Sequence, residues 1–82
     1  MAKDENFALE IYYNESVSYM IFTSFLVTEF SMPDSQADQI FLILRNNKKI
    51  TLFKNFDKDI LLEKSERFED LGIDNKIIKC YE

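Results

Sequence analysis

A residue period of two predicts that the chain begins its fold with a strand from Phe7 to Tyr13. One face of this strand is expected to lie against a core. Two later stretches are also β-like: Ile50 to Phe53 is short, and Lys76 to Tyr81 ends the chain. The residues of the first strand that share the core face are Phe7, Leu9, Ile11 and Tyr13, and they alternate with Ala8, Glu10 and Tyr12.

Two helical patterns lie almost back to back between the first two strands. The stretch from Val17 to Phe30 is apolar nearly all round, so we expect a buried central helix, although its valine, threonine and aromatic content would also suit a strand. A second, amphipathic helix follows Pro33, because apolar residues recur there with the spacing of three and four that one helix face requires. These residues are Ala37, Ile40, Phe41 and Leu44.

Polar residues indicate where these two helices begin. Asn14 and Ser16 are both good helix N-caps, since their side-chain oxygens can accept a hydrogen bond from a free backbone N–H of the first turn. Ser31 and Asp34 have the spacing of a capping box for the second helix, and proline is tolerated in a first helical turn.

A third helix is predicted between Asp57, as its N-cap, and Gly72, which stands where a glycine commonly ends a helix. The apolar residues between them fall on one side of this helix and the acidic residues on the other. The acidic side is expected to be a solvated surface, with a docking patch as the alternative.

The predicted order is therefore β-α-α-β-α-β, in one domain over residues 7–82 that follows a short polar tail at residues 1–6. The fold class is α+β: a two-layer domain in which a three-stranded, mainly antiparallel sheet carries three helices on one face. An alternative order, β-α-β-β-α-β, makes Ile40 to Leu44 a strand paired with Ile50 to Phe53. The helical spacing that begins at Ala37 favours the first order.

Composition argues against an enzyme. The 82 residues contain no histidine and one cysteine, so histidine-dependent nucleophiles, histidine bases and histidine or cysteine metal sites are excluded. The acidic residues are scattered and do not converge on one site. We expect no catalytic residues, no metal and no cofactor, and we expect Cys80 to be a small buried hydrophobic residue.

Charge and hydropathy limit the classes of partner that this chain is expected to bind. A net charge of −5 without a basic stripe argues against nucleic-acid binding. The first six residues do not form a signal peptide, and the apolar run up to Phe30 is too short and too polar to span a bilayer. The chain is therefore expected to be cytoplasmic, with a protein or peptide as its partner.

The stretch Phe30 to Leu42 is similar to the second helix of the ClpS family of bacterial adaptors, with Ala37, Gln39 and Leu42 placed as in the family pattern. The resemblance covers about residues 7–82. It implies a non-enzymatic adaptor that recognises destabilising N-terminal residues, with an AAA+ Clp chaperone and its substrates as partners and the regulation of proteolysis as its role.

The end of the third helix, Glu66 to Gly72, is equally similar to the C-terminal domain of the ribosomal stalk protein. That domain shares the fold and docks translation factors through its helices. This second resemblance implies the alternative function: a small interaction or inhibitor protein that uses the same fold as a docking surface.

The ClpS resemblance also implies a peptide-binding site. The family's Asn-Asp-Asp stretch, which helps to hold the substrate's α-amine, is matched by Asn14, Glu15 and Ser16. The family's Thr-Pro-Met at the start of the first helix is similar to Ser18-Tyr19-Met20, without the proline.

The apolar pocket of the family would fall to Met20, Phe41, Leu44 and Ile77, and the family's histidine, which contacts the amine, is matched by Arg45. A guanidinium accepts no hydrogen bond and repels an ammonium group, so the binding site is altered. Each residue also has a structural alternative: Met20, Phe41 and Leu44 as core, Asn14 as a helix cap, and Arg45 as a cation at a helix C-terminus.

Overall fold

The computed structural model describes residues 6–80, and it confirms the predicted order β-α-α-β-α-β. The alternative order is wrong, because Ile40 to Leu44 lie inside a helix. The predicted tail, apart from Asn6, and Tyr81 lie outside the described residues. The elements are β1 (Asn6–Tyr12), α1 (Tyr19–Phe30), α2 (Asp34–Asn47), β2 (Lys49–Phe56), α3 (Lys58–Leu71) and β3 (Asn75–Cys80).

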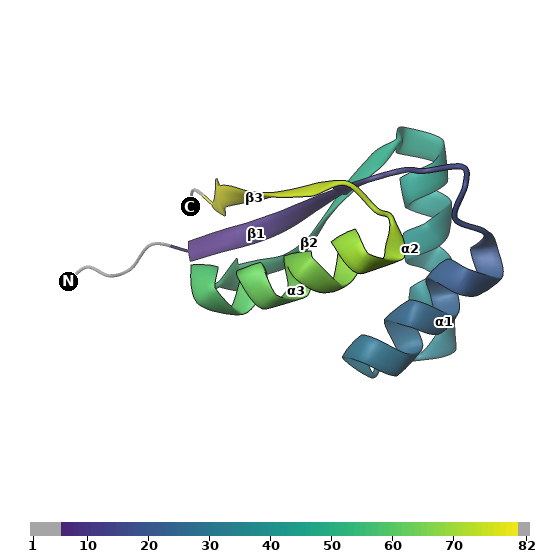
Figure 1. The fold of residues 1–82 in the computed structure, drawn as a ribbon, viewed down its shortest axis with the longest axis horizontal. Helices are drawn as coiled ribbons and strands as arrows, with labels where there is room; N and C mark the ends of the chain where they lie inside the picture. Colours follow the sequence, from purple (N-terminus) through teal and green to yellow (C-terminus); the bar gives the residue numbers. More distant parts are fainter. Residues whose placement is uncertain (1–5, 81–82) are drawn as a thin grey trace.

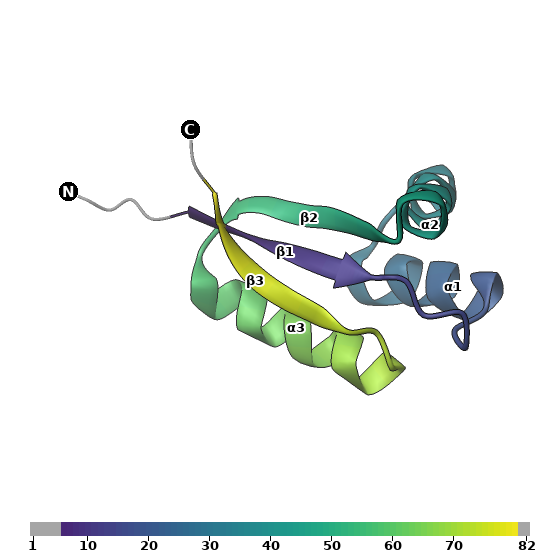
Figure 2. The same cartoon turned by 90° about the horizontal axis from the view of Figure 1, so that it is seen from above.

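The sheet has the strand order β2-β1-β3, and β1 is antiparallel to both neighbours (Figures 1 and 2). Leu9 of β1 lies opposite Leu52 of β2 and Ile77 of β3, so these three residues share one face of the sheet. Helix α3 lies along this face, and Leu61 and Phe68 of α3 are fully buried in the core. The period-two pattern of β1 therefore identified the buried face correctly.

Helices α1 and α2 lie beyond the end of the sheet (Figures 1 and 2). Helix α1 packs mainly against α2, and it reaches α3 through Phe25, whose ring centroid lies 5.0 Å from that of Phe68. The stretch from Val17 to Phe30 does contain a helix, but the expectation that this helix is buried and central is wrong. Only Phe22 and Leu26 are fully buried, because α1 has neighbours on one side and does not lie under the sheet.

The helix starts differ from the predicted caps. Ser18 is the N-cap of α1, and its Oγ accepts a hydrogen bond of 3.2 Å from the backbone N–H of Ile21. Neither Asn14 nor Ser16 caps the helix, since the chain makes a further turn before α1 begins.

The predicted capping box at Ser31 is also wrong. Ser31 instead ends α1 in the left-handed conformation, with φ = 56°, and α2 starts after Pro33, which has no side-chain acceptor. Asp57 does precede α3 as its N-cap residue, but its side chain makes no capping hydrogen bond. The predicted end of α3 is confirmed: Gly72 has φ = 100°, and its N–H is directed to the carbonyl oxygens of Phe68 and Glu69.

Strand β2 is longer and less regular than Ile50 to Phe53. Phe7 lies opposite Phe56 while Leu9 lies opposite Leu52, so β2 contains extra residues between these pairs. Phe53 and Asn55 take up the bulge with φ values of 55° and 65°. The bulge brings Phe53 and Phe56 together on one side, at a ring-centroid distance of 5.8 Å.

Three phenylalanine rings near this bulge surround the ammonium group of Lys64. The Nζ atom lies 4.7 Å from the ring centroid of Phe53, 4.8 Å from that of Phe30 and 5.7 Å from that of Phe56. A cation over the face of an aromatic ring is attracted by the ring quadrupole. Lys64 therefore connects α3 to the end of α1 and to the bulge of β2.

Cys80 is half-buried, which corrects the expectation of a buried core residue. Its position in the register explains the difference. Cys80 lies opposite Asn6, and Ile78 lies opposite Ala8, so Cys80 shares the face of the sheet that points away from α3. Within the described residues, no helix is both long and apolar enough to cross a membrane.

Candidate functional site

The predicted pocket residues of α2 lie in the core. Phe41 is 6% exposed and Leu44 is 1% exposed. The ring of Phe41 packs against Tyr19 at 5.4 Å, Phe22 at 5.8 Å and Tyr13 at 6.3 Å between centroids. Phe41 is thus enclosed by the rings of three neighbouring residues.

The other two predicted pocket residues differ from each other in exposure and in position. Met20, at the start of α1, is 73% exposed, whereas Ile77 is half-buried on the α3 face of β3. The structure therefore gives the four apolar residues three different surroundings: the core for Phe41 and Leu44, solvent for Met20, and the sheet for Ile77.

Asn14 holds the connection between β1 and α1 in place. Its Nδ2 donates a hydrogen bond of 2.8 Å to the carbonyl oxygen of Gly72, and its Oδ1 accepts one of 2.9 Å from the backbone N–H of Ser16. Both polar atoms of the side chain are thus used within the domain. Glu15 next to it is exposed, and Ser18 serves as the cap of α1.

Arg45 is exposed in the last turn of α2, and its guanidinium carbon lies 5.8 Å from the ring centroid of Phe41. A cation suits the C-terminal end of a helix, where unpaired carbonyl groups concentrate negative charge. Arg45 therefore has two structural interactions, one with the helix end and one with the aromatic ring.

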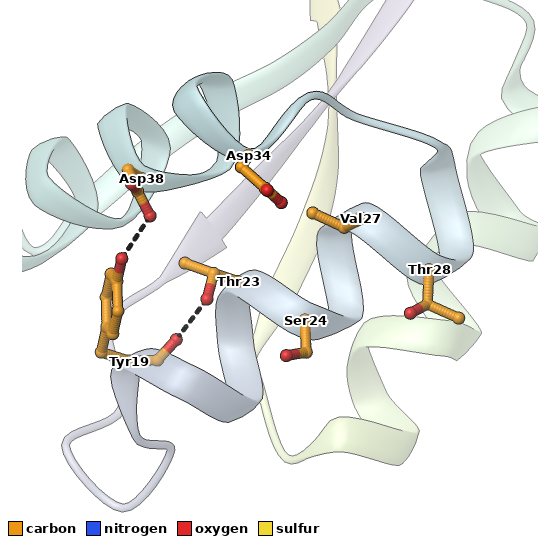
Figure 3. A pocket seen from close by; sticks show the side chains of 7 residues that line it. All are labelled: Tyr19, Thr23, Ser24, Val27, Thr28, Asp34 and Asp38. Carbon is orange, nitrogen blue, oxygen red and sulfur yellow. Dashed lines mark hydrogen bonds between the residues drawn. The ribbon is translucent and has the colours of Figure 1, made fainter.

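A pocket of about 360 Å³ lies between α1 and α2 (Figure 3). Of the residues matched to the family's peptide site, Tyr19 lines this pocket and the others do not. Hydroxyl groups and two carboxylates make its wall mostly polar. The lining residues are Tyr19, Thr23, Ser24, Val27 and Thr28 of α1 and Asp34 and Asp38 of α2.

Hydrogen bonds order one side of this pocket. The phenol of Tyr19 donates to Oδ1 of Asp38 at 2.5 Å, and Oγ1 of Thr23 donates to the carbonyl oxygen of Tyr19 at 2.8 Å (Figure 3). The bond to Asp38 is the main reason that the pKa of Tyr19 is raised, and burial and the charges of Asp38 and Asp34 add to it. Within residues 6–80, the side chain of Asp34 has no hydrogen bond and no salt bridge.

Large apolar side chains are exposed beside the pocket. Tyr19, Met20 and Ile21 are consecutive and are 47%, 73% and 55% exposed. Met20 lies three and four residues before Thr23 and Ser24, so it shares their side of α1. On α2, Leu42 follows Asp38 by four residues and is 47% exposed. We call these four apolar residues, together with Asp34 and Asp38, the α1–α2 surface.

The sequence alone does not reveal this surface. Its spacing predicts a capping box for Asp34, and Met20 is expected as a pocket residue or, alternatively, as core. One signal in the sequence does point to it: no lysine or arginine occurs between Asp4 and Leu44. The acidic residues of this stretch are consequently left without nearby bases in the sequence.

Comparison of this chain with protein-family models, with curated proteins and with solved structures finds no match. Among residues 6–80, no group of three or more acidic or cysteine side chains is arranged to hold a metal ion.

Proposed function

We propose that this chain is a non-enzymatic adaptor that binds another protein through the α1–α2 surface. The observation that supports this most directly is the exposure of Tyr19, Met20 and Ile21 at the start of α1. Single exposed apolar residues are common on soluble proteins, and here three follow one another in the first turn of one helix. Methionine and tyrosine are also among the residue types enriched at such sites.

The position of these residues on the fold supports the proposal. Helix α1 contacts α2 and α3 with its buried residues, and Met20 and Ile21 lie outside these contacts and are exposed. Folding alone gains little from an apolar side chain at Met20, because that residue is 73% exposed. A protein partner that covers Met20 would bury it.

This proposal can be tested by site-specific photo-crosslinking in the cell of origin. A photoreactive amino acid at position 20 should capture a partner, and the same amino acid at Leu62 should not. Leu62 is a matched control because it is also a large apolar residue, 47% exposed, on a different helix. The substitution Ile21→Asp should abolish the crosslink, whereas Leu62→Asp should leave it unchanged. Equal capture from positions 20 and 62 would contradict the proposal.

A more specific form of the proposal is that the adaptor recognises destabilising N-terminal residues and delivers them to an AAA+ Clp protease. The family resemblance supports it, as does the position of Asn14, Ser18 and Met20 around the start of α1. Binding of an N-terminal leucine or phenylalanine would require the ring of Phe41 to move, because that residue is buried. Arg45 would have to turn away from the incoming ammonium group.

Arg45→His tests this specific form. The variant should bind peptides that begin with leucine or phenylalanine more tightly than the original protein, since a neutral imidazole can accept a hydrogen bond from the amine. Acetylation of the peptide N-terminus should remove the binding. If neither protein distinguishes free from acetylated peptides, N-terminal recognition is wrong, and the adaptor then acts through the α1–α2 surface alone.

A further inference from the structure

We propose that a segment of a partner protein docks on the α1–α2 surface and carries a lysine or arginine side chain next to an apolar one. This segment lies away from the termini of the partner's chain. The inference deepens the proposed function and rests on it. The apolar side chain would cover Met20, and the basic side chain would enter the pocket between α1 and α2, where Asp34 and Asp38 form the wall.

The distribution of charge over the molecule favours a basic partner. Every lysine or arginine among the described residues lies at Arg45 or beyond it in the sequence. All charged residues of β1, of α1 and of the part of α2 before Arg45 are therefore acidic. Glu29 forms a salt bridge of 3.5 Å with Arg67 of α3. Glu15, Asp34 and Asp38 form no salt bridge within residues 6–80. The α1–α2 surface thus presents uncompensated negative charge beside its apolar residues.

The basic side chains are also unevenly distributed over the aromatic rings of the domain. Among residues 6–80, the bases lie over rings elsewhere in the molecule, for example Lys48 over Tyr13 at 5.1 Å and Lys58 over Phe7 at 5.9 Å. None of these cation–ring contacts involves Tyr19, although this residue is 47% exposed. A base from a partner could therefore contact both a carboxylate and the face of this ring.

The spacing of the groups suits a short segment. Asp34, Asp38 and Leu42 follow one another at intervals of four residues, so they form one stripe along α2. Figure 3 shows Asp34 and Asp38 on the side of α2 that faces α1, with Val27 between the two helices. The aspartates lie about one or two helical turns from Leu42 along α2. A short segment could therefore make an ionic contact with the aspartates and an apolar contact with Met20 and Leu42.

The test uses three capped peptides and the 15N-labelled protein. The peptides differ only at the centre of the motif, Leu-Lys-Leu, Leu-Gln-Leu or Leu-Glu-Leu, between identical serine and glycine flanks. Acetylated N-termini exclude N-terminal recognition. The lysine peptide should shift the amide signals of residues 19–28 and 34–42 and bind most tightly, and the glutamate peptide should bind least tightly. Added salt should reduce the difference, because it screens exposed charges.

Charge variants locate the interaction. Asp38→Asn and Asp34→Asn should each weaken the lysine peptide about two- to fivefold, the effect expected for one exposed ion pair. Asp70→Asn on α3 is the matched control, since it removes the same charge by the same chemical change from an exposed position on another helix. It should leave the affinity unchanged. Unchanged amide spectra outside the surface verify that each variant is folded.

The outcomes separate this inference from the proposed function. If the glutamine and glutamate peptides bind the α1–α2 surface as tightly as the lysine peptide, the basic partner is wrong and the docking surface stands. If Asp70→Asn weakens binding as much as Asp38→Asn, the attraction is a general property of an acidic protein, and the inference is overturned. It is also overturned if the lysine peptide shifts amides only outside residues 19–42.

Discussion

Glu10 lies on the face of the sheet that points away from α3, and its surroundings favour the charged carboxylate. The phenol of Tyr12 donates a hydrogen bond of 2.6 Å to Oε1, and Nζ of Lys49 lies 3.6 Å from Oε2. The hydrogen bond from Tyr12 is the main cause that lowers the pKa of Glu10, and the charges of Lys49 and Lys76 act in the same direction against the opposing effect of burial.

This shift predicts how stability depends on pH. Because the pKa of Glu10 is lower in the folded than in the unfolded state, its contribution is present above the ordinary value of 4.5 and is lost as the pH falls through the lowered folded value. The free energies of unfolding of the original protein and of Glu10→Gln, measured with urea, should differ at pH 7 and become equal in acid. A difference that grows as the pH falls would contradict the prediction.

Lys64 offers a second test at the scale of the residue. Lys64→Met keeps most of the side-chain volume and removes the charge that the three phenylalanine rings surround. It should lower the free energy of unfolding by about 1 kcal/mol, within the range expected for cation–π contacts. Lys58→Met is the control, because Lys58 lies over one ring only, at 5.9 Å, and should cost less. Chemical denaturation at neutral pH measures both.

At the scale of the element, all three helices end in the left-handed conformation, with different residues. Ser31 ends α1 at φ = 56°, Lys48 ends α2 at φ = 74° and Gly72 ends α3 at φ = 100°. A residue with a Cβ atom is disfavoured in this conformation, whereas glycine is not. A methyl group at Gly72 would meet Cγ2 of Val17 at 3.9 Å, so space does not exclude it.

Two substitutions should therefore change stability in opposite directions. Gly72→Ala should lower the free energy of unfolding by about 1–2 kcal/mol, because alanine is strained at this φ value. Ser31→Gly should raise it by up to about 1 kcal/mol, since it relieves the same strain at a solvent-exposed site. Thermal or urea unfolding of both variants gives the comparison. Equal signs would show that backbone strain is not the main factor at these positions.

The existence and order of the elements could be predicted because their signals are local. Alternation in β1, the spacing of three and four in α2 and the glycine after α3 each describe a few neighbouring residues. The caps of α1 and α2 could not be predicted reliably. Asn14, Ser16 and Ser18 are all able to cap a helix, and Ser18 does so because Asn14 is held by Gly72, 58 residues further along the chain.

At the scale of the whole molecule, the arrangement of layers explains why an apolar helix is half exposed. Helix α1 lies beyond the end of the sheet, so its buried residues face α2 and α3 and its other residues face solvent (Figure 1). The same arrangement leaves the anionic pocket open between α1 and α2.

This arrangement predicts very different effects for two nearby residues of α1. Phe22→Ala should cost about 3–5 kcal/mol of stability, because Phe22 is 1% exposed in the core. Met20→Asn should change stability by no more than about 0.5 kcal/mol, as expected for an exposed position. Circular dichroism with urea denaturation measures both values. A large loss at Met20 would mean that this side chain is needed for folding rather than free for a partner.

The candidate site shows the limit of sequence reasoning most clearly. Phe41 and Leu44 have the spacing of any amphipathic helix, and the structure places them in the core. Whether an apolar side chain at such a position lines a pocket or fills the core depends on what lies opposite it. For Phe41, the rings of Tyr13, Tyr19 and Phe22 fill that space.

The sequence by itself determined the α+β class, the order of the six elements, the buried face of β1 and the glycine end of α3. These features depend on periodicity and on the conformational preferences of single residues, which act over a few positions. Only the tertiary structure decided which side of α1 is covered, where β2 bulges and that Asp34 and Asp38 share a pocket with Tyr19. These features depend on contacts between residues that are distant in the chain, and a local pattern does not contain them.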